Sequence, residues 1–83
     1  MPRIEIYTKP FCPYCERAKA LFERKGAAYE EIAAGMDADK RQEMRDRSGR
    51  ATYPQIFIDG RHIGGCDDLM ELDAKGELDG YLT

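Results

Sequence analysis

The 83-residue sequence has no tryptophan, one histidine and no long apolar run. No stretch approaches the roughly 18 apolar residues of a membrane span, and the first residues lack the apolar segment of a secretory signal peptide. There is also no basic stripe of the kind that binds nucleic acid, and the net charge is −3. These absences predict a soluble, cytoplasmic protein that binds neither membrane nor nucleic acid.

The three cysteines form an odd set, whereas a secreted disulfide scaffold normally carries an even one. The cysteines are therefore expected to perform chemistry or to bind a metal. Apolar residues make up 42% of the chain and charged residues 35%, with both signs present. That balance argues against disorder, and the length predicts a single domain over residues 1–83. We expect a monomer.

The hydrophobic pattern predicts an α/β fold with the order β-α-β-α-β-β-α. Strands are expected at 3–7, 28–32, 55–58 and 61–63, and helices at 14–25, 38–47 and from Asp67 or Asp68 onward, with one more turn near Leu78. Asp59-Gly60 predicts a tight hairpin turn. One mixed four-stranded sheet with helices on both faces accommodates all of these elements.

The motif Cys12-Pro13-Tyr14-Cys15 lies where the first strand gives way to the first helix. Proline is favoured at the first helical position, so Cys12 is predicted to be the N-cap. The unpaired amides and positive end of a helix favour a thiolate at that place, and Lys9 adds a positive charge upstream. We therefore predict that Cys12 is the attacking thiolate. Cys15 lies one helical turn inward and is predicted to resolve the mixed disulfide.

Other interpretations of the cysteines remain open. Cys12, Cys15, His62 and Cys66 could form a Cys₃His zinc set, although the long gap between its halves is unlike a compact structural site. Cys12 could also ligate an iron–sulfur cluster shared by two chains. Taken singly, Cys66 reads as a spare thiol and His62 as a surface or edge residue. The basic cluster at 40–50 reads as a solvated helix face or as a site for a small anion.

Three motifs in order resemble a dithiol glutaredoxin: Tyr7-Thr8-Lys9 before the C-P-Y-C motif, then Thr52-Tyr53-Pro54-Gln55, then Gly64-Gly65-Cys66-Asp67-Asp68. The resemblance extends from about Ile4 to Leu82. It implies the thioredoxin-like fold and a glutathione-dependent thiol–disulfide oxidoreductase. Such an enzyme reduces protein disulfides through Cys12 and Cys15, and glutathione mixed disulfides through Cys12 alone, with glutathione as co-substrate and no metal.

The resemblance also implies which residues hold glutathione. They are Lys9, Tyr14, Arg41, Thr52, Tyr53, Pro54, Gly65, Cys66 and Asp67. Thr52 and the backbone of Tyr53 are expected to pair with the tripeptide main chain, and Pro54 is expected to be cis. Cys66 and Asp67 are expected to hold the γ-glutamyl end, and Arg41 the glycyl carboxylate. Asp67 alone would instead read as a helix N-cap.

One departure from the family pattern leaves substrate specificity open, and two rival functions remain. Tyr53 stands where the family commonly has valine, so its larger ring is expected to narrow the groove or to stack on a partner. A related redox enzyme served by thioredoxin reductase, or a cluster carrier, are the rival functions. Lys9, Thr52 and the 65–67 turn favour glutathione as the reductant, and Pro13 argues against a cluster because it stiffens the loop and removes an amide.

Overall fold

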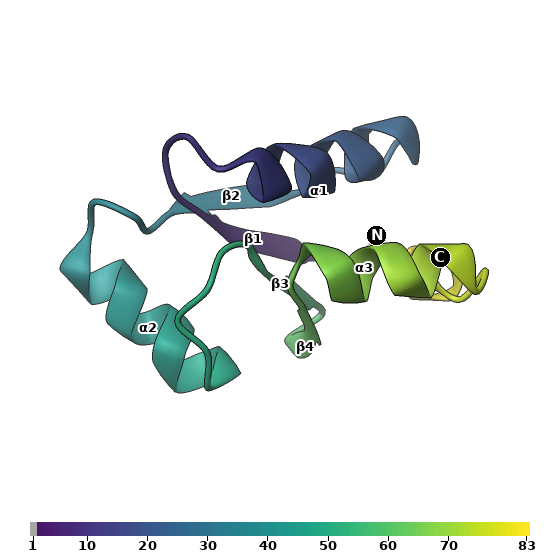
Figure 1. Cartoon of the computed structure of the whole chain (residues 1–83). Helices are drawn as coiled ribbons and strands as arrows, with labels where there is room; N and C mark the ends of the chain where they lie inside the picture. Colours follow the sequence, from purple (N-terminus) through teal and green to yellow (C-terminus); the bar gives the residue numbers. More distant parts are fainter. Residues whose placement is uncertain (1) are drawn as a thin grey trace.

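The computed structural model describes residues 2–83, and its elements follow the expected order with one further helical turn at the end (Figure 1). They are β1 (Ile4–Thr8), α1 (Pro13–Arg24), β2 (Glu30–Ala33), α2 (Ala38–Ser48), β3 (Gln55–Ile58), β4 (Arg61–Gly64), α3 (Cys66–Ala74) and α4 (Leu78–Tyr81). The second strand begins two residues later than its pattern predicted. Among these elements, no helix is both long enough and apolar enough to cross a membrane.

The four strands form one mixed sheet in the order β2-β1-β3-β4. β1 runs parallel to β2 and antiparallel to β3, and β3 pairs antiparallel with β4. Asp59 and Gly60 join β3 to β4 with φ values of 51° and 81°, which is the backbone that a two-residue hairpin turn requires. The expected mixed sheet is therefore confirmed.

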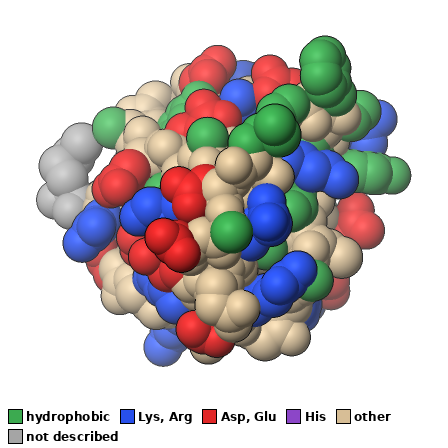
Figure 2. All heavy atoms as spheres, turned by 90° about the vertical axis from the view of Figure 1, so that its left-hand side faces the viewer, with side chains coloured by type: hydrophobic (Ala, Val, Ile, Leu, Met, Phe, Trp, Pro, Cys, Tyr) green, Lys and Arg blue, Asp and Glu red, His purple; other side chains and the backbone are tan. Residues whose placement is uncertain are grey.

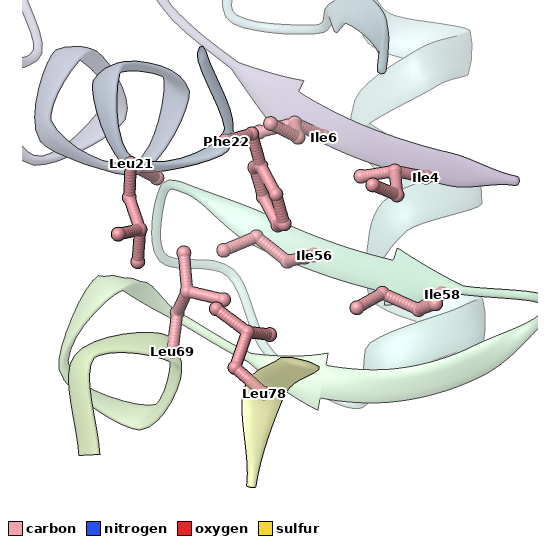
Figure 3. Close-up of a cluster of buried hydrophobic side chains, with 9 residues drawn as sticks. Ile4, Ile6, Leu21, Phe22, Ile56, Ile58, Leu69 and Leu78 are labelled. Atoms are coloured by element: carbon pink, nitrogen blue, oxygen red, sulfur yellow. The ribbon is translucent and has the colours of Figure 1, made fainter. Parts of the chain in front are cut away.

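One face of the sheet carries the main hydrophobic core. Ile4 and Ile6 of β1 and Ile56 and Ile58 of β3 point to this face because alternate strand residues share a side. Figure 3 shows them packed against side chains from α1, α3 and α4, namely Leu21, Phe22, Leu69 and Leu78. Burying these side chains fixes α1 and α3 on the same side of the sheet, so that the beginnings of both helices lie near the end of β1.

The opposite face is covered by α2 and is partly polar. Met44 of α2 packs there with Tyr7 and Phe57. Glu5, only 7% exposed, also points to this face and accepts hydrogen bonds from both terminal nitrogens of Arg47 at 3.0 and 3.1 Å. Helices thus cover both faces, as predicted. The interpretation of residues 40–50 as a purely solvated face is wrong for Arg47, which turns inward to a buried carboxylate.

Candidate active site

The cysteine that the sequence predicts to attack lies at the start of α1. Cys12 is the N-cap residue with extended backbone, and Pro13 occupies the first helical position, as the sequence predicted. The amide N–H of Cys15 donates a hydrogen bond to Sγ of Cys12 at 3.2 Å. The helix end therefore supplies a fixed donor and a positive dipole at the sulfur that is expected to attack.

Cys15 differs from Cys12 in its surroundings. Its side chain is completely buried, whereas Cys12 retains 6% exposure, and both are free thiols in the structure. Burial, followed by the hydrogen bond with Cys12, raises the pKa of Cys15 to about 12. As long as Cys12 is a free thiol, Cys15 consequently stays protonated near neutral pH. Because the thiolate is the nucleophilic form of cysteine, Cys15 is a poor nucleophile in this state.

A groove of about 320 Å³ runs beside the first turn of α1. Three segments that are far apart in the sequence form it: Tyr14 on α1, the segment before β3, and the turn that opens α3. Its lining residues are Tyr14, Arg50, Thr52, Tyr53, Pro54, Gly65, Cys66, Asp67 and Asp68. Seven of the nine residues expected to hold glutathione are in this set, so the fold brings most of the predicted site together.

The groove wall depends on a close approach between two backbone segments. The Tyr53–Pro54 peptide bond is cis, as the resemblance implies. A Cβ on Gly65 would lie 3.4 Å from the Pro54 carbonyl oxygen, at ordinary contact distance, so the two segments lie side by side. Gly64 has φ of +124°, and a Cβ there would lie 2.2 Å from Oδ2 of Asp68. Gly64 therefore has a structural reason to be a glycine.

Asp68, rather than Asp67, caps α3. The helix begins at Cys66 with Gly65 as its N-cap, and the Asp68 carboxylate accepts the Gly65 N–H at 2.9 Å. The reading of Asp67 as the N-cap is therefore wrong. Its carboxylate is exposed at the groove, and the amides of Cys66 and Asp67 belong to the first helical turn, where no intrahelical acceptor is available. This turn presents donors and one carboxylate to the groove.

Cys66 is buried close to the reactive motif. It is 6% exposed, and burial, with a smaller contribution from Asp67, raises the pKa of its thiol. The Cys66 thiol is therefore protonated and packed inside the protein, while its backbone amide faces the groove. No catalytic role for this thiol follows from its surroundings.

Lys9 lies at the edge of the groove without lining it. Its Nζ is 5.6 Å from the centre of the Tyr53 ring, within range of a cation–π contact. Tyr53 also packs against the core beneath α2. The tyrosine that departs from the family pattern therefore turns its ring toward the second core and toward Lys9.

Two of the four arginines in the 40–50 cluster, Arg41 and Arg50, bear on the groove, and Arg41 does not lie where the resemblance implied. Arg41 donates from Nη1 to the Gly35 carbonyl at 2.9 Å and does not line the groove, whereas Arg50 lines it and pairs with Asp68 at 3.0 Å. Sequence reasoning missed Arg50 and Asp68. The available signals were Arg50's place two residues before Thr52 and Asp68's place three residues after the glycine N-cap.

The proposed zinc ligands do not form a set in the part of the chain that is described. His62 is engaged elsewhere, because its Nε2 lies 2.7 Å from Oε1 of Gln55 and its ring is 5.0 Å from that of Phe57. Among residues 2–83, no three histidine, cysteine or acidic side chains gather closely enough to hold a metal ion.

Comparisons with known proteins agree on one family. The glutaredoxin family model matches residues 4–63. The chain is 60% identical to glutaredoxin 3 of Escherichia coli K12 over 82 residues, which is 99% of each protein. It is 47% identical to a Pseudomonas aeruginosa glutaredoxin over 83 residues, covering 100% of this chain and 99% of the relative.

Solved structures give the same result for the fold. The solution structure of Brucella melitensis glutaredoxin has a TM-score of 0.85 at 56% identity, covering 96% of this chain and 87% of that one. The crystal structure of a buckwheat glutaredoxin–glutathione complex has a TM-score of 0.87 at 36% identity, covering 95% and 74%. The expected thioredoxin-like fold is confirmed, and the chain belongs to the glutaredoxin family of glutathione-dependent thiol–disulfide oxidoreductases.

Proposed function

We propose that Cys12 is the nucleophile of this enzyme and that Cys15 is its resolving thiol. The observation that carries the proposal is the hydrogen bond from the Cys15 amide to Cys12 Sγ at the start of α1. A thiolate, not a thiol, attacks a disulfide, and this helix end stabilises negative charge on Cys12 alone.

Two routes follow from the pair. With a glutathione mixed disulfide, the Cys12 thiolate attacks the glutathionyl sulfur, the substrate leaves as a thiolate, and a second glutathione attacks to release glutathione disulfide. With a protein disulfide, Cys12 bonds to one substrate sulfur while the other leaves, and Cys15 then attacks Cys12 to free the substrate. Two glutathione molecules reduce the resulting Cys12–Cys15 disulfide.

The timing of the second route has a physical basis in Cys15. Besides burial, the hydrogen bond with Cys12 and the charge of Cys12 raise the pKa of Cys15. The contribution from charge on Cys12 disappears when Cys12 enters a mixed disulfide, and a disulfide sulfur is a weaker hydrogen-bond acceptor than a thiolate. Cys15 therefore becomes easier to deprotonate only after Cys12 has reacted, which suppresses its side reactions beforehand.

The groove supports glutathione as the electron donor. We assign the main chain of the tripeptide to Thr52 and the backbone of Tyr53 next to Pro54, in the manner of an added strand. The γ-glutamyl end is assigned to the Cys66 and Asp67 amides and the Asp67 carboxylate, with Tyr14 and Gly65 completing the wall. A buckwheat glutaredoxin, whose fold this chain shares, has been solved as a complex with glutathione, which supports glutathione as the ligand of the family.

The cationic side chains near the site differ in whether they reach the groove. Arg50 lines the groove and Lys9 lies at its edge, so we assign the glycyl carboxylate to these two residues. Arg41, expected from the resemblance to take that role, does not line the groove, and its Nη1 donates to the Gly35 carbonyl.

The decisive experiment compares two cysteine variants. Cys12→Ser is expected to abolish glutathione-dependent turnover of both a mixed disulfide and a protein disulfide. Cys15→Ser is expected to retain the mixed-disulfide activity and to lose the protein-disulfide activity. Equal loss of mixed-disulfide turnover in both variants contradicts the assignment of roles, provided that circular dichroism shows both variants folded.

We further propose that residues 1–83 act as one domain, as a monomer, in the cytoplasm. The single continuous sheet supports the first point, and the dithiol chemistry proposed for Cys12 and Cys15 needs a compartment that keeps thiols reduced between reactions. Light scattering across a concentration series and cell fractionation test the other two, with a concentration-dependent dimer or a membrane-bound pool as the opposing results.

A further inference from the structure

The large apolar side chains that remain exposed are gathered at one edge of the molecule. Phe11 is 102% exposed, Met36 86% and Tyr14 52%. Phe11 immediately precedes Cys12, Tyr14 lies within the motif, and Met36 lies in the loop between β2 and α2. Exposed apolar side chains that cluster in this way mark interaction sites more often than singly scattered ones do.

Contacts through Gly35 hold the two loops together. A Cβ on Gly35 would lie 2.5 Å from Cβ of Lys9 and 3.0 Å from Cδ of Pro10, so its backbone rests directly on that segment. The amides of Ala34 and Gly35 both donate to the Thr8 carbonyl, at 2.9 and 3.2 Å. Because the loops touch at these residues, Phe11, which follows Pro10, and Met36, which follows Gly35, project from adjacent loops. We term this exposed region the Phe11–Met36 patch.

The backbone of Phe11 is in the left-handed region, with φ of +56°. A large side chain seldom adopts this conformation, which costs about 1–3 kcal/mol unless the surroundings impose it. The loop thus accepts a disfavoured backbone while its aromatic side chain lies entirely in solvent. Packing of the Phe11 side chain within the chain does not stabilise that arrangement, because the side chain is fully exposed.

The patch has a positive border. The Lys9 side chain passes Gly35 at its Cβ and ends 5.6 Å from the centre of the Tyr53 ring, and Arg41 donates to the Gly35 carbonyl. Within the described residues neither cation forms an ion pair with a carboxylate. Figure 2 looks onto this edge, where apolar side chains gather toward the upper right with Lys and Arg side chains below them. Uncompensated cations beside apolar side chains favour a partner that offers an apolar group and a carboxylate.

We propose that the Phe11–Met36 patch is the docking surface for protein substrates whose disulfide cysteine is flanked by an apolar side chain and an acidic one. This inference rests on the proposed function, because a protein disulfide must come close to Cys12. Cys12 is only 6% exposed, and its chain neighbour Phe11 projects fully, so a segment reaching the sulfur covers the patch. The glutathione groove does not include Phe11 or Met36, so the two surfaces differ in their apolar residues and share only the cation Lys9 at their common edge.

Docking precedes the first step of the protein-disulfide route. The Cys12 thiolate attacks the nearer substrate sulfur, the Cys12–substrate bond forms, and the other substrate cysteine leaves as a thiolate. No glutathione takes part in this step, so Lys9 is free to meet the substrate carboxylate together with Arg41. Selection by the patch thus acts on substrate choice and leaves the chemistry at sulfur unchanged.

The test uses short cyclic peptides closed by a disulfide, with Leu and Asp, Ser and Asp, or Leu and Lys beside one cysteine. Wild-type protein is expected to prefer the Leu–Asp peptide. The double variant Phe11→Ser with Met36→Ser should lose about tenfold in kcat/KM on that peptide, because two apolar contacts are removed. Turnover of the small mixed disulfide of glutathione and mercaptoethanol should stay as in wild type. Phe11→Leu with Met36→Leu is the matched control and should keep the preference.

A second measurement separates the patch from the proposed function. In a Cys15→Ser background the peptide is trapped on Cys12, and the trapping rate, read by mass spectrometry, requires no glutathione. Equal rates for the three peptides, or an equal loss on the small mixed disulfide, overturn the docking proposal. Failure of wild-type protein to use glutathione with any substrate overturns the proposed function, while the trapping rates still decide whether the patch selects peptides.

Discussion

Arg47 of α2 contacts both carboxylate oxygens of Glu5 on β1, at 3.0 and 3.1 Å, beneath the sheet. The guanidinium also lies 4.0 Å from the centre of the Phe57 ring and donates to the Tyr7 hydroxyl at 2.9 Å. Tyr7 in turn donates to Glu43. α2 is therefore held to the sheet by a charged network as well as by Met44.

Replacing Arg47 by Ala should lower the free energy of unfolding by about 2 kcal/mol, since the Glu5 carboxylate is left buried without its main partner. Urea denaturation measures the change. Arg45→Ala, on the exposed face of the same helix, is the control and should stay within about 0.5 kcal/mol of wild type. In a Glu5→Gln background the cost of Arg47→Ala should shrink; an unchanged cost would show that the pair does not contribute.

The cap of α3 predicts a dependence of stability on pH. The hydrogen bond from the Gly65 amide, followed by the bond from Arg50, holds the pKa of Asp68 below its ordinary value. Because the pKa of Asp68 is lower in the folded protein than in the unfolded chain, its carboxylate stabilises the native state at pH values above the unfolded-state pKa, near 3.9. This stabilisation is lost as the pH falls through the folded-state pKa of Asp68. Asp68→Asn should therefore cost about 1 kcal/mol at pH 7, and the gap from wild type should close in strong acid.

Asp67→Asn is the matched control for the cap because it removes the same charge from the same helical turn without removing a hydrogen bond. Thermal unfolding at several pH values compares the three proteins. A gap for Asp68→Asn that persists unchanged into strong acid, or an equal effect of Asp67→Asn at neutral pH, contradicts the capping role.

Two glycines are expected to respond to alanine with opposite signs. Gly64→Ala should destabilise the protein by about 2 kcal/mol or more, because the new Cβ meets the capping carboxylate of Asp68 at 2.2 Å and φ is +124°. Gly80→Ala in α4 meets open space and should stabilise by about 0.5–1 kcal/mol. Denaturant midpoints of the two variants test this, and destabilisation of similar size in both would refute the steric argument.

Cys12 and Cys66 allow a test of thiol reactivity at equal exposure. Each is 6% exposed, but only Cys12 accepts an amide N–H at a helix start, while burial raises the pKa of Cys66 and of Cys15. Iodoacetamide at neutral pH should therefore modify Cys12 first, and mass spectrometry should find one adduct. Unfolded protein provides the control with three adducts. Modification of Cys66 as fast as Cys12 would show that exposure alone governs reactivity.

Local sequence patterns were sufficient for much of the architecture. Alternation in β1, the stripe of α1, the Asp59-Gly60 turn and the proline after Cys12 are properties of neighbouring residues, and each produced the expected element. The position of Cys12 as an N-cap followed for the same reason, since a cap depends only on the residues around it. The resemblance added the cis bond at Pro54 and the grouping of Thr52 with Cys66.

The remaining features depend on contacts between residues far apart in the chain. Arg47 and Arg50 belong to one basic run, yet the fold directs the first to the buried Glu5 and the second to Asp68 in the groove wall. Nothing local distinguishes them, because their partners lie 42 and 18 positions away. The sequence alone thus determined the order of elements and the reactive motif. Tertiary structure decided which charges meet, where Arg41 lies, and that Phe11 and Met36 share one exposed edge, because only packing of the sheet and helices brings those residues together.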